Sequence, residues 1–204
     1  MSMDGFLAVH SGLHREGPGT AADVAWATAE ARTPPDARVC DAACGPGADV
    51  EALRAAAPDG TVLAFDRHLP FVAQAASRHR RDPAVTVSDG LLIGAGDPVA
   101  CGPFDLIWCA GAVYFEGVER TLSHWRAALR PGGAVAFSHP VNFAAPDADM
   151  RAFWDGATVG DEDALEACAA SAIRVAVAEA RREAAEWRRL RDRLGYALRV
   201  VRPT

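Results

Sequence analysis

The sequence predicts an α/β fold: a doubly wound, mostly parallel sheet of seven strands with helices on both faces. Three observations predict it. Short apolar runs alternate with alanine-rich, helix-forming stretches along the chain. The runs are apolar at consecutive positions, which is typical of strands covered on both faces. A glycine loop, Gly45-Pro46-Gly47, joins the first run to the helical stretch that follows it.

Glycines, a helix cap and two prolines predict the elements at the start of the chain. Residues 6–19 predict a short helix and a glycine-rich loop. Thr20 is the expected N-cap of a helix that extends to about Ala31, and Pro34 and Pro35 end it.

The central region predicts alternating strands and helices. The apolar runs give five expected strands: residues 38–42, 61–65, 84–87, 104–109 and 134–138. The stretches between them give three expected helices: residues 48–57, 70–80 and 119–129. The last of these helices places Leu122, Trp125 and Leu129 on one face. Residues 130–133, Arg-Pro-Gly-Gly, predict a sharp turn before the fifth strand.

The last third of the chain completes the sheet. It predicts a helix at 161–171, a strand at 173–178, a helix at 183–194 and a final strand at 196–201. The arginines between 181 and 193 are interleaved with acidic residues, which is typical of a solvated helix face rather than a nucleic-acid contact.

The composition excludes several chemistries. A chain of 204 residues is expected to form one domain, and its net charge of −6 argues against nucleic acid as the main partner. All 21 basic residues are arginine. Without lysine, the chain can form no Schiff base and no phosphate-binding loop of the Gly-Lys-Ser/Thr type.

The sequence also indicates a compartment. The N-terminus has no basic and apolar leader, and no run approaches the ~18 apolar residues of a membrane helix. The five cysteines are odd in number and none forms a CxxC pair, so we expect neither disulfides nor a metal site. A cytoplasmic protein without a membrane partner is the expectation.

The glycine loop favours a ligand site at the carboxyl ends of the strands. The dinucleotide pattern GxGxxG fails, because Val50 occupies the third glycine position. Asp41 precedes the loop, and its charge would disfavour a pyrophosphate and favour a cationic ligand.

Two further aspartates follow the next two strands. Asp66 comes 21 residues after Gly45, where a carboxylate can accept both hydroxyls of a ribose; the alternative is a helix N-cap. Asp89 follows the third strand and can accept from an exocyclic amine such as that of adenine; the alternative is an ordinary turn residue.

In this order and spacing, the motifs resemble those of class I S-adenosylmethionine-dependent methyltransferases. The resemblance rests on residues 41–47, Asp66, Asp89, residues 104–108 and residues 129–133. It implies a Rossmann-like fold and S-adenosylmethionine as cofactor, without a metal. The cofactor residues that it implies are Asp41, Ala43, Cys44, Gly45, Gly47, Asp66, Arg67, Asp89, Gly90, Cys109 and Ala110. Family members usually have glycine in place of Ala43, and often in place of Ser88.

A narrower resemblance links residues 12–19, residues 105–114 and Phe153-Trp154 to a bacterial group of ubiquinone-methylase-like, small-molecule methyltransferases. It implies that residues 1–33 form an N-terminal lid over a core at 34–139, with acceptor-side elements at 140–204. Arg15 on the lid is the expected partner of the cofactor's methionine carboxylate; the alternative is a solvated arginine.

The acceptor is expected beside the fourth and fifth strands. His139 ends the fifth strand and suits a general base, and Tyr114 follows the fourth strand; each alternatively has a packing role only. His10, His14 and Trp154 are weaker candidates. The Asn/Asp-Pro-Pro-aromatic motif that marks base or amide nitrogen acceptors in the family is missing.

Together these features predict methyl transfer to a small molecule by in-line displacement, in a monomer or homodimer. Two alternatives stay open. One is a non-catalytic protein that binds S-adenosylmethionine or S-adenosylhomocysteine, and the other is a nucleotide-dependent oxidoreductase. The sequence leaves the acceptor and the methylated atom open.

Overall fold

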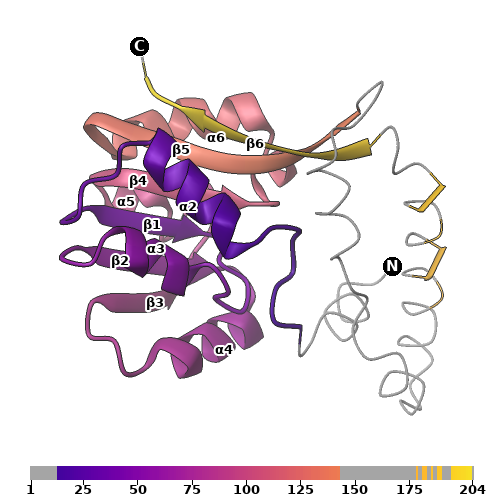
Figure 1. The fold of residues 1–204 in the computed structure, drawn as a ribbon, viewed down its shortest axis with the longest axis horizontal. Helices are drawn as coiled ribbons and strands as arrows, with labels where there is room; N and C mark the ends of the chain where they lie inside the picture. The colour runs from indigo at the N-terminus through magenta and orange to yellow at the C-terminus, as the bar shows by residue number, and fades with distance from the viewer. Residues whose placement is uncertain are drawn as a thin grey trace. The chain divides into compact units, whose positions relative to one another are not determined.

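The computed structural model describes residues 13–142, 178, 181–182, 185, 188–189 and 194–203, excluding the side chains of 140–142 and 194. The chain forms two compact units. One comprises Gly17–Pro140 and Tyr196–Thr204, and the other comprises Met1–Glu16 and Val141–Gly195. The first unit holds the sheet described below (Figure 1).

The sheet confirms the expected α/β fold. Its strand order is β3-β2-β1-β4-β5-β6, and the pairs from β3 to β5 are parallel. The strands are β1 Arg38–Ala42, β2 Thr61–Asp66, β3 Val85–Asp89, β4 Phe104–Ala110, β5 Leu129–Asn142 and β6 Leu194–Val201. From β1 the chain winds outward to β3, and it then returns to build β4 and β5 on the other side of β1. This reversal is the position at which open α/β sheets bind ligands.

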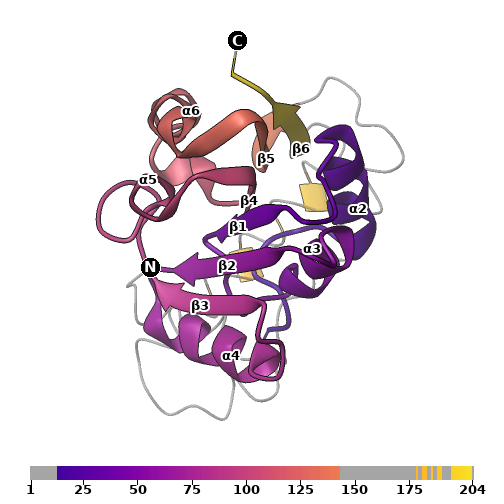
Figure 2. The ribbon, with the colours of Figure 1, turned by 90° about the vertical axis from the view of Figure 1, so that its left-hand side faces the viewer.

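Helices cover both faces of the sheet (Figure 2). The helices are α2 Ala21–Glu30, α3 Val50–Ala56, α4 Leu69–His79, α5 Pro98–Cys101 and α6 Val118–Trp125, with short 3₁₀ turns η1 Val113–Phe115 and η2 Arg126–Ala128. The core residues of α2, α3 and α4 pack on one face, and those of α6 pack on the other. From Leu106 to Ala110, consecutive residues of β4 alternate between the two clusters, which explains why this part of the strand is apolar at every position.

The helix expected after Thr20 has the predicted cap. The carboxylate of Asp23 accepts hydrogen bonds from the backbone N–H and the hydroxyl of Thr20, at 2.7 and 2.8 Å. Val24 and Ala27 of α2 are fully buried in the core, so this part of the expected lid packs with the sheet.

Several expectations differ from the structure. The described sheet has six strands where the sequence predicts seven; residues 173–177 of the expected additional strand lie outside the described residues, and Ala178 is helical. The expected turn at 130–133 lies within β5, where the register with β4 shifts and Gly132 has a φ of +82°. Leu129 begins this strand and does not end the preceding helix. The four-residue α5 was not predicted.

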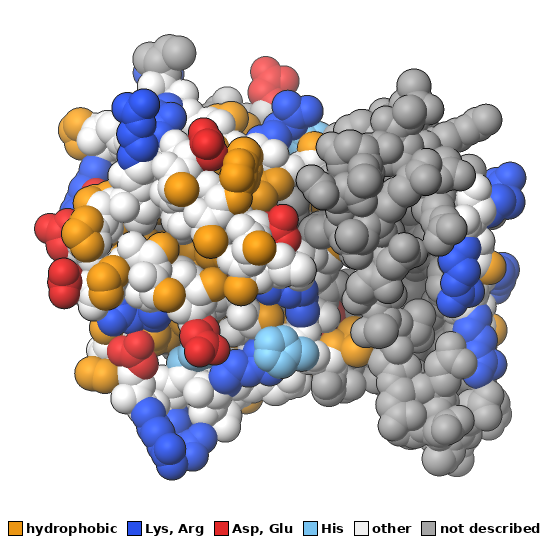
Figure 3. Space-filling model, viewed as in Figure 1, with side chains coloured by type: hydrophobic (Ala, Val, Ile, Leu, Met, Phe, Trp, Pro, Cys, Tyr) orange, Lys and Arg blue, Asp and Glu red, His pale blue; other side chains and the backbone are white. Residues whose placement is uncertain are grey.

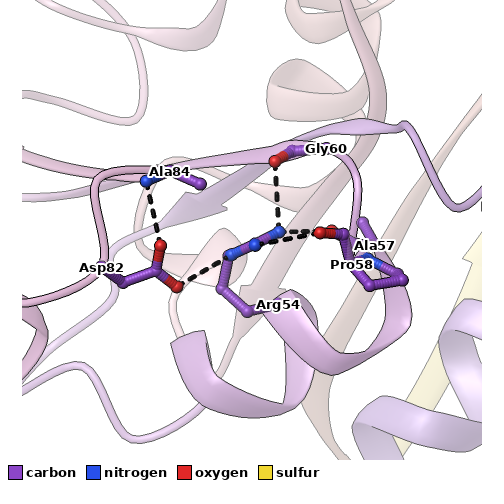
Figure 4. Close-up of polar contacts among 6 residues, drawn as sticks. All are labelled: Arg54, Ala57, Pro58, Gly60, Asp82 and Ala84. Atoms are coloured by element: carbon purple, nitrogen blue, oxygen red, sulfur yellow. Dashed lines mark hydrogen bonds and ion pairs between the residues drawn. The ribbon is translucent and has the colours of Figure 1, made fainter.

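The side chain of Arg54 joins the turns that precede β2 and β3, and we call this set of contacts the Arg54 clamp (Figure 4). The guanidinium of Arg54 donates to the carbonyls of Ala57, Pro58 and Gly60 and pairs with Asp82 at 3.0 Å. The Asp82 carboxylate also accepts from the N–H of Ala84. The clamp therefore holds the turns that precede two strands whose opposite ends carry the predicted site.

The surface of the described part mixes charges of both signs. On the face drawn in Figure 3, acidic and basic side chains are interspersed with apolar ones. Among the described residues, no helix has the length and apolar character needed to cross a membrane.

Candidate functional site

Three predicted aspartates lie at the carboxyl ends of neighbouring strands. Asp66 and Asp89 are register partners at the ends of β2 and β3. Asp41 pairs with Ala64 and therefore lies two residues deeper in the sheet. Asp41 and Asp66 are buried, whereas Asp89 is exposed. The structure thus brings the three carboxylates to one edge, as the parallel order requires.

The loop after β1 has an unusual backbone. Ala43, Gly45 and Gly47 all have positive φ angles, of +60°, +54° and +79°. A Cβ on Gly47 would lie 2.9 Å from the Cβ of Ala75 in α4, so glycine is required here by packing as well as by conformation. Ala43 adopts the same left-handed region with a side chain, which costs about 1–2 kcal/mol.

Asp66 holds this loop in place. One carboxylate oxygen accepts from the N–H of Gly45 at 2.9 Å, and the other accepts from the N–H of His68 at 2.8 Å. Each oxygen keeps a second lone pair with which it can accept from a ligand. The sequence predicted the ligand role of Asp66 but not its bond to a residue 21 positions away.

Two contacts of the loop region were missed by sequence reasoning. The Nε2 of His79, the last residue of α4, lies 2.8 Å from the carbonyl oxygen of Gly47. The indole N–H of Trp108 in β4 donates to the carboxylate of Asp49 at 3.0 Å. These contacts fix the loop against α4 and against β4. Neither has a local sequence signal, because each joins residues more than 30 positions apart.

The three cysteines near the site are buried and pack as small apolar side chains. Burial raises the pKa of the thiols of Cys40, Cys44 and Cys109 well above the ordinary value, and the nearby carboxylate of Asp41 raises it further. These thiols stay protonated at neutral pH and do not act as nucleophiles.

The other predicted cofactor residues also lie at this edge. Ala110 ends β4, Gly90 follows Asp89, and both are half-buried, while Arg67 follows Asp66 and is exposed. A Cβ on Gly90 would lie 2.7 Å from the carbonyl oxygen of Gly96, so the backbone turns tightly after β3. Arg15 belongs to the other compact unit, and its contact with a cofactor stays a prediction.

Two tyrosines meet beside the end of β4. The hydroxyls of Tyr114 and Tyr196 lie 3.4 Å apart, and these are the two tyrosines of the chain. A Cβ on Gly111 would lie 3.8 Å from Cε1 of Tyr196. The N–H of Gly111 donates to the hydroxyl of Ser138 at 2.9 Å. The sequence predicted Tyr114 as a site residue; Tyr196 and Ser138 were missed.

His139 has a cationic neighbour. The Nε–H of Arg199 in β6 donates to Nε2 of His139 at 3.1 Å, which assigns the neutral imidazole its proton on Nδ1. In this arrangement the Nε2 lone pair accepts the hydrogen bond from Arg199. The sequence predicted that His139 ends the fifth strand, but β5 continues to Asn142, so His139 lies within the strand, one residue beyond the last register pair with β4. Its bond to Arg199 was not foreseen. His10 and Trp154 lie outside the described residues.

The residues present fit a cationic, hydroxyl-bearing ligand. The ends of β1, β2 and β3 supply carboxylates, which accept hydrogen bonds and attract positive charge. The loop close to them has three residues with positive φ, two of which are glycines without a side chain, as a ligand that approaches the main chain needs.

The comparisons with known proteins agree with this geometry. Residues 39–133 match a family model described as "Methyltransferase domain". A malonyl-[acyl-carrier protein] O-methyltransferase from Pseudescherichia vulneris is 35% identical over 130 residues, which are 63% of this chain and 47% of that protein. The chain therefore spans about half the length of this relative.

Two solved structures share the fold over the whole chain. One is an S-adenosylmethionine-dependent methyltransferase from Geobacter sulfurreducens in complex with S-adenosylhomocysteine, with a TM-score of 0.74 and 20% identity. The other, from Thiobacillus denitrificans with the same ligand, has a TM-score of 0.70 and 18% identity. Each comparison covers 100% of this chain and 99% of the other chain. At these identities the likeness establishes the fold.

Proposed function

We propose that this chain, whose residues 39–133 match a methyltransferase-domain model, is a class I S-adenosylmethionine-dependent methyltransferase that transfers a methyl group to a small-molecule acceptor. The observation that carries the proposal is the geometry of one sheet edge, where a left-handed loop after β1 faces the ends of three strands that carry aspartates. When bound, S-adenosylmethionine supplies an electrophilic methyl group on a sulfonium.

The cofactor would be held mainly by carboxylates and backbone. Asp66 would accept from ribose hydroxyls with its remaining lone pairs, and Asp89 would accept from the adenine amine. Asp41 would supply negative charge near the cationic end, and Arg15 would pair with the methionine carboxylate. The contacting backbone would come from Ala43, Cys44, Gly45, Gly47, Arg67, Gly90, Cys109 and Ala110.

The catalytic task of the chain is mainly to position the acceptor. Holding an acceptor atom in line with the transferred group can supply roughly 7–11 kcal/mol of the barrier reduction. Tyr114, in the 3₁₀ turn after β4, and His139, in the last part of β5, are the proposed acceptor-side residues. We also propose a single domain with lid, core and acceptor-side segments at 1–33, 34–139 and 140–204, working in the cytoplasm as a monomer or homodimer.

Calorimetric titration tests the cofactor. S-adenosylmethionine and S-adenosylhomocysteine should bind with micromolar dissociation constants, and NAD should give no signal. Asp89→Asn should weaken binding at least tenfold, because it removes a charged acceptor at the exposed end of β3. Asp36→Asn, an exposed carboxylate that precedes β1, is the matched control and should bind normally. Binding of NAD alone would replace the proposal with an oxidoreductase.

A second experiment tests turnover. The protein with methyl-labelled S-adenosylmethionine is presented with a panel of small hydroxyl, carboxyl, amine and thiol compounds. The panel includes a malonyl thioester, because the relative from Pseudescherichia vulneris acts by its name on a malonyl group. Normal cofactor binding without methyl transfer to any compound would favour the non-catalytic binding protein.

A further inference from the structure

We propose that Tyr114 and Tyr196 bind the methyl acceptor through their hydroxyls and that this acceptor is a neutral amine. The inference rests on the proposed function and names the acceptor class of the same site. Its basis is one face of the sheet, on which Asp41, the end of β4 and Tyr196 lie. All of these residues belong to the compact unit that holds the sheet.

Tyr196 lies on the face of the sheet that α2, α3 and α4 cover. Leu198 and Val200 of β6 pack in the core on this face, and alternate residues of a strand point to the same side. Ala110 of β4 packs in the same core. A Cβ on Gly111 would lie 3.8 Å from Cε1 of Tyr196, so the Tyr196 ring lies beside the end of β4.

Tyr114 reaches the same place from the 3₁₀ turn after β4. Its ring lies edge-on to that of Tyr196, with the centroids 6.5 Å apart, and the two hydroxyl oxygens are 3.4 Å apart. Two hydroxyls have two protons and four lone pairs, and a bond between them uses one of each. The pair can therefore donate and accept without a formal charge, which suits a neutral polar group.

Asp41 gives this face a negative charge. Val39 of β1 packs in the same core, so Asp41, two residues further along the strand, points to the same side. Asp41 is the register partner of Trp108, and Ala110 follows Trp108 by two residues on β4. A buried carboxylate this close to the end of β4 disfavours an anionic acceptor and favours one that becomes positively charged.

The opposite face holds the imidazole that the sequence suggests as a base. Val135 and Phe137 of β5 pack in the other core, so His139 points to that side, where it accepts from Arg199. An acceptor held by the tyrosines therefore has to react without this base. A hydroxyl needs a base to take its proton during transfer, whereas a neutral amine attacks with its own lone pair.

The group transfer to an amine balances without a base on the protein. The nitrogen lone pair forms the bond to the methyl carbon, and the carbon–sulfur bond breaks with its electron pair left on sulfur. The product is a methylammonium ion, which then releases a proton to water. The tyrosine hydroxyls accept from the N–H groups of the amine and so direct its lone pair.

Removal of single hydroxyls tests the site with the amines of the acceptor panel. Tyr114→Phe and Tyr196→Phe each keep the ring, and each should lower kcat/KM for the methylated amine about fivefold to tenfold. The dissociation constant of S-adenosylhomocysteine should stay within about twofold of the native value, which shows that the variants fold. The double variant should lose less than the product of the single losses, because the two hydroxyls act as one unit.

Thr86→Val is the matched control. It removes a hydroxyl from an exposed residue of β3, at the other edge of the sheet from β6, and should keep the native kcat/KM. Tyrosine variants that behave like this control would overturn the inference.

The tyrosines also give a binding readout that needs no turnover. The chain has two tyrosines, so protein labelled with carbon-13 at tyrosine Cζ gives two NMR signals, which the single variants assign. Butylamine, benzylamine and glycinamide are titrated into the protein loaded with S-adenosylhomocysteine, and at least one should shift both signals. If none of the amines shifts either signal, the inference is overturned.

The pH profile identifies the neutral amine as the reacting form. kcat/KM should rise with pH up to the pKa of the acceptor itself, which is about 8 for an α-amino group such as that of glycinamide and about 10.4 for an alkylamine. The profile should therefore level near pH 8 for glycinamide and still rise at pH 9 for butylamine. A common midpoint near pH 6.5 for both amines would indicate a histidine base and contradict the inference.

The outcomes separate this inference from the function on which it rests. If S-adenosylhomocysteine does not bind, or no compound of any class is methylated, the proposed function fails. If alcohols, thiols or carboxylates are methylated and amines are not, the proposed function stands and the amine inference alone fails.

Discussion

Ala43 stands where members of the resembled family usually have glycine, and its backbone is strained. Its φ of +60° lies in the region that glycine adopts without cost and alanine does not. The chain keeps this conformation because both neighbours are fixed. Ala42 is the fully buried last residue of β1, and the N–H of Cys44 donates to the carbonyl of Phe65 at 2.9 Å.

Replacing Ala43 with glycine should therefore stabilise the protein. We expect Ala43→Gly to raise the free energy of unfolding by about 1 kcal/mol, since relief of the left-handed strain exceeds the added entropy of the unfolded chain. Urea denaturation measures the change. Ala42→Gly is the matched control and should lower stability by at least about 0.5–1 kcal/mol, because Ala42 is an ordinary buried strand residue. Equal destabilisation by both substitutions would contradict the strain.

The side chain of His79 contacts the loop that follows β1. It lies 2.8 Å from the Gly47 carbonyl, in the place that leaves no room for a Cβ on Gly47. We expect His79→Leu to weaken S-adenosylhomocysteine binding about fivefold to tenfold, because the loop loses an anchor of about 1 kcal/mol. His79→Gln, which keeps a side-chain donor, should restore most of the affinity in the same calorimetric titration. Unchanged binding by His79→Leu would remove His79 from the positioning of the loop.

At the scale of the elements, local sequence signals predicted most of the fold. The cap at Thr20, the apolar runs of β1 to β4 and Pro70 at the start of α4 each depend on neighbouring residues only. The region 129–133 was predicted wrongly, because its proline and glycines indicate a turn while pairing with β4 keeps it in β5 as an irregularity. α5 spans four residues and is too short for periodicity.

The candidate site was predicted as far as strand ends determine it. Asp41, Asp66 and Asp89 meet because parallel strands end at one edge. The contacts that give these residues their geometry join distant positions, such as Gly45 with Asp66 and His139 with Arg199. No spacing rule signals such pairs, because they depend on the packed register of the sheet.

The loop after β3 contains a buried carboxylate with a measurable pH signature. Asp97 accepts from the N–H groups of Gly94 and Ala100, and from His124 in α6 at 2.7 Å. Burial works against its charge, but the donors of Gly94, His124 and Ala100 outweigh burial and lower the pKa of Asp97. The loop that follows Asp89 is thereby tied to α6.

This lowered pKa should make the protein less stable in acid. A carboxyl whose folded pKa is depressed contributes its full stability above the unfolded value of about 3.9 and loses it as the pH falls through the folded value. Asp97→Asn should therefore cost about 1–3 kcal/mol at pH 7 and progressively less below about pH 4. Urea denaturation of both proteins across this range measures the difference. A constant difference at every pH would contradict the assignment, and exposed Asp59→Asn provides the baseline.

Across the described sheet, the proposed ligand site lies at the carboxyl ends of the strands and the Arg54 clamp lies at the amino ends. The Arg54 clamp fixes the turns before β2 and β3, while the glycine loop and the aspartates occupy the opposite ends. Because Asp66 accepts from Gly45 and His68, the same carboxylate holds the fold and is proposed to bind the ligand. Loss of ligand binding in an Asp66 variant thus has two possible causes, which thermal unfolding can separate.

Cofactor binding should raise the unfolding temperature in a pattern that distinguishes these roles. At a hundred times its dissociation constant, a ligand that binds only the folded state adds about 2.7 kcal/mol, or about 5–10 °C for a chain of this size. Asp89→Asn should keep the unliganded transition temperature, because Asp89 is exposed, and should show a smaller shift when S-adenosylhomocysteine is added at the concentration used for the native protein. Asp66→Asn should lower the unliganded temperature by several degrees as well, because two backbone N–H groups lose a charged acceptor. An Asp66→Asn protein with the native unliganded transition would show that Asp66 contributes to the ligand site alone.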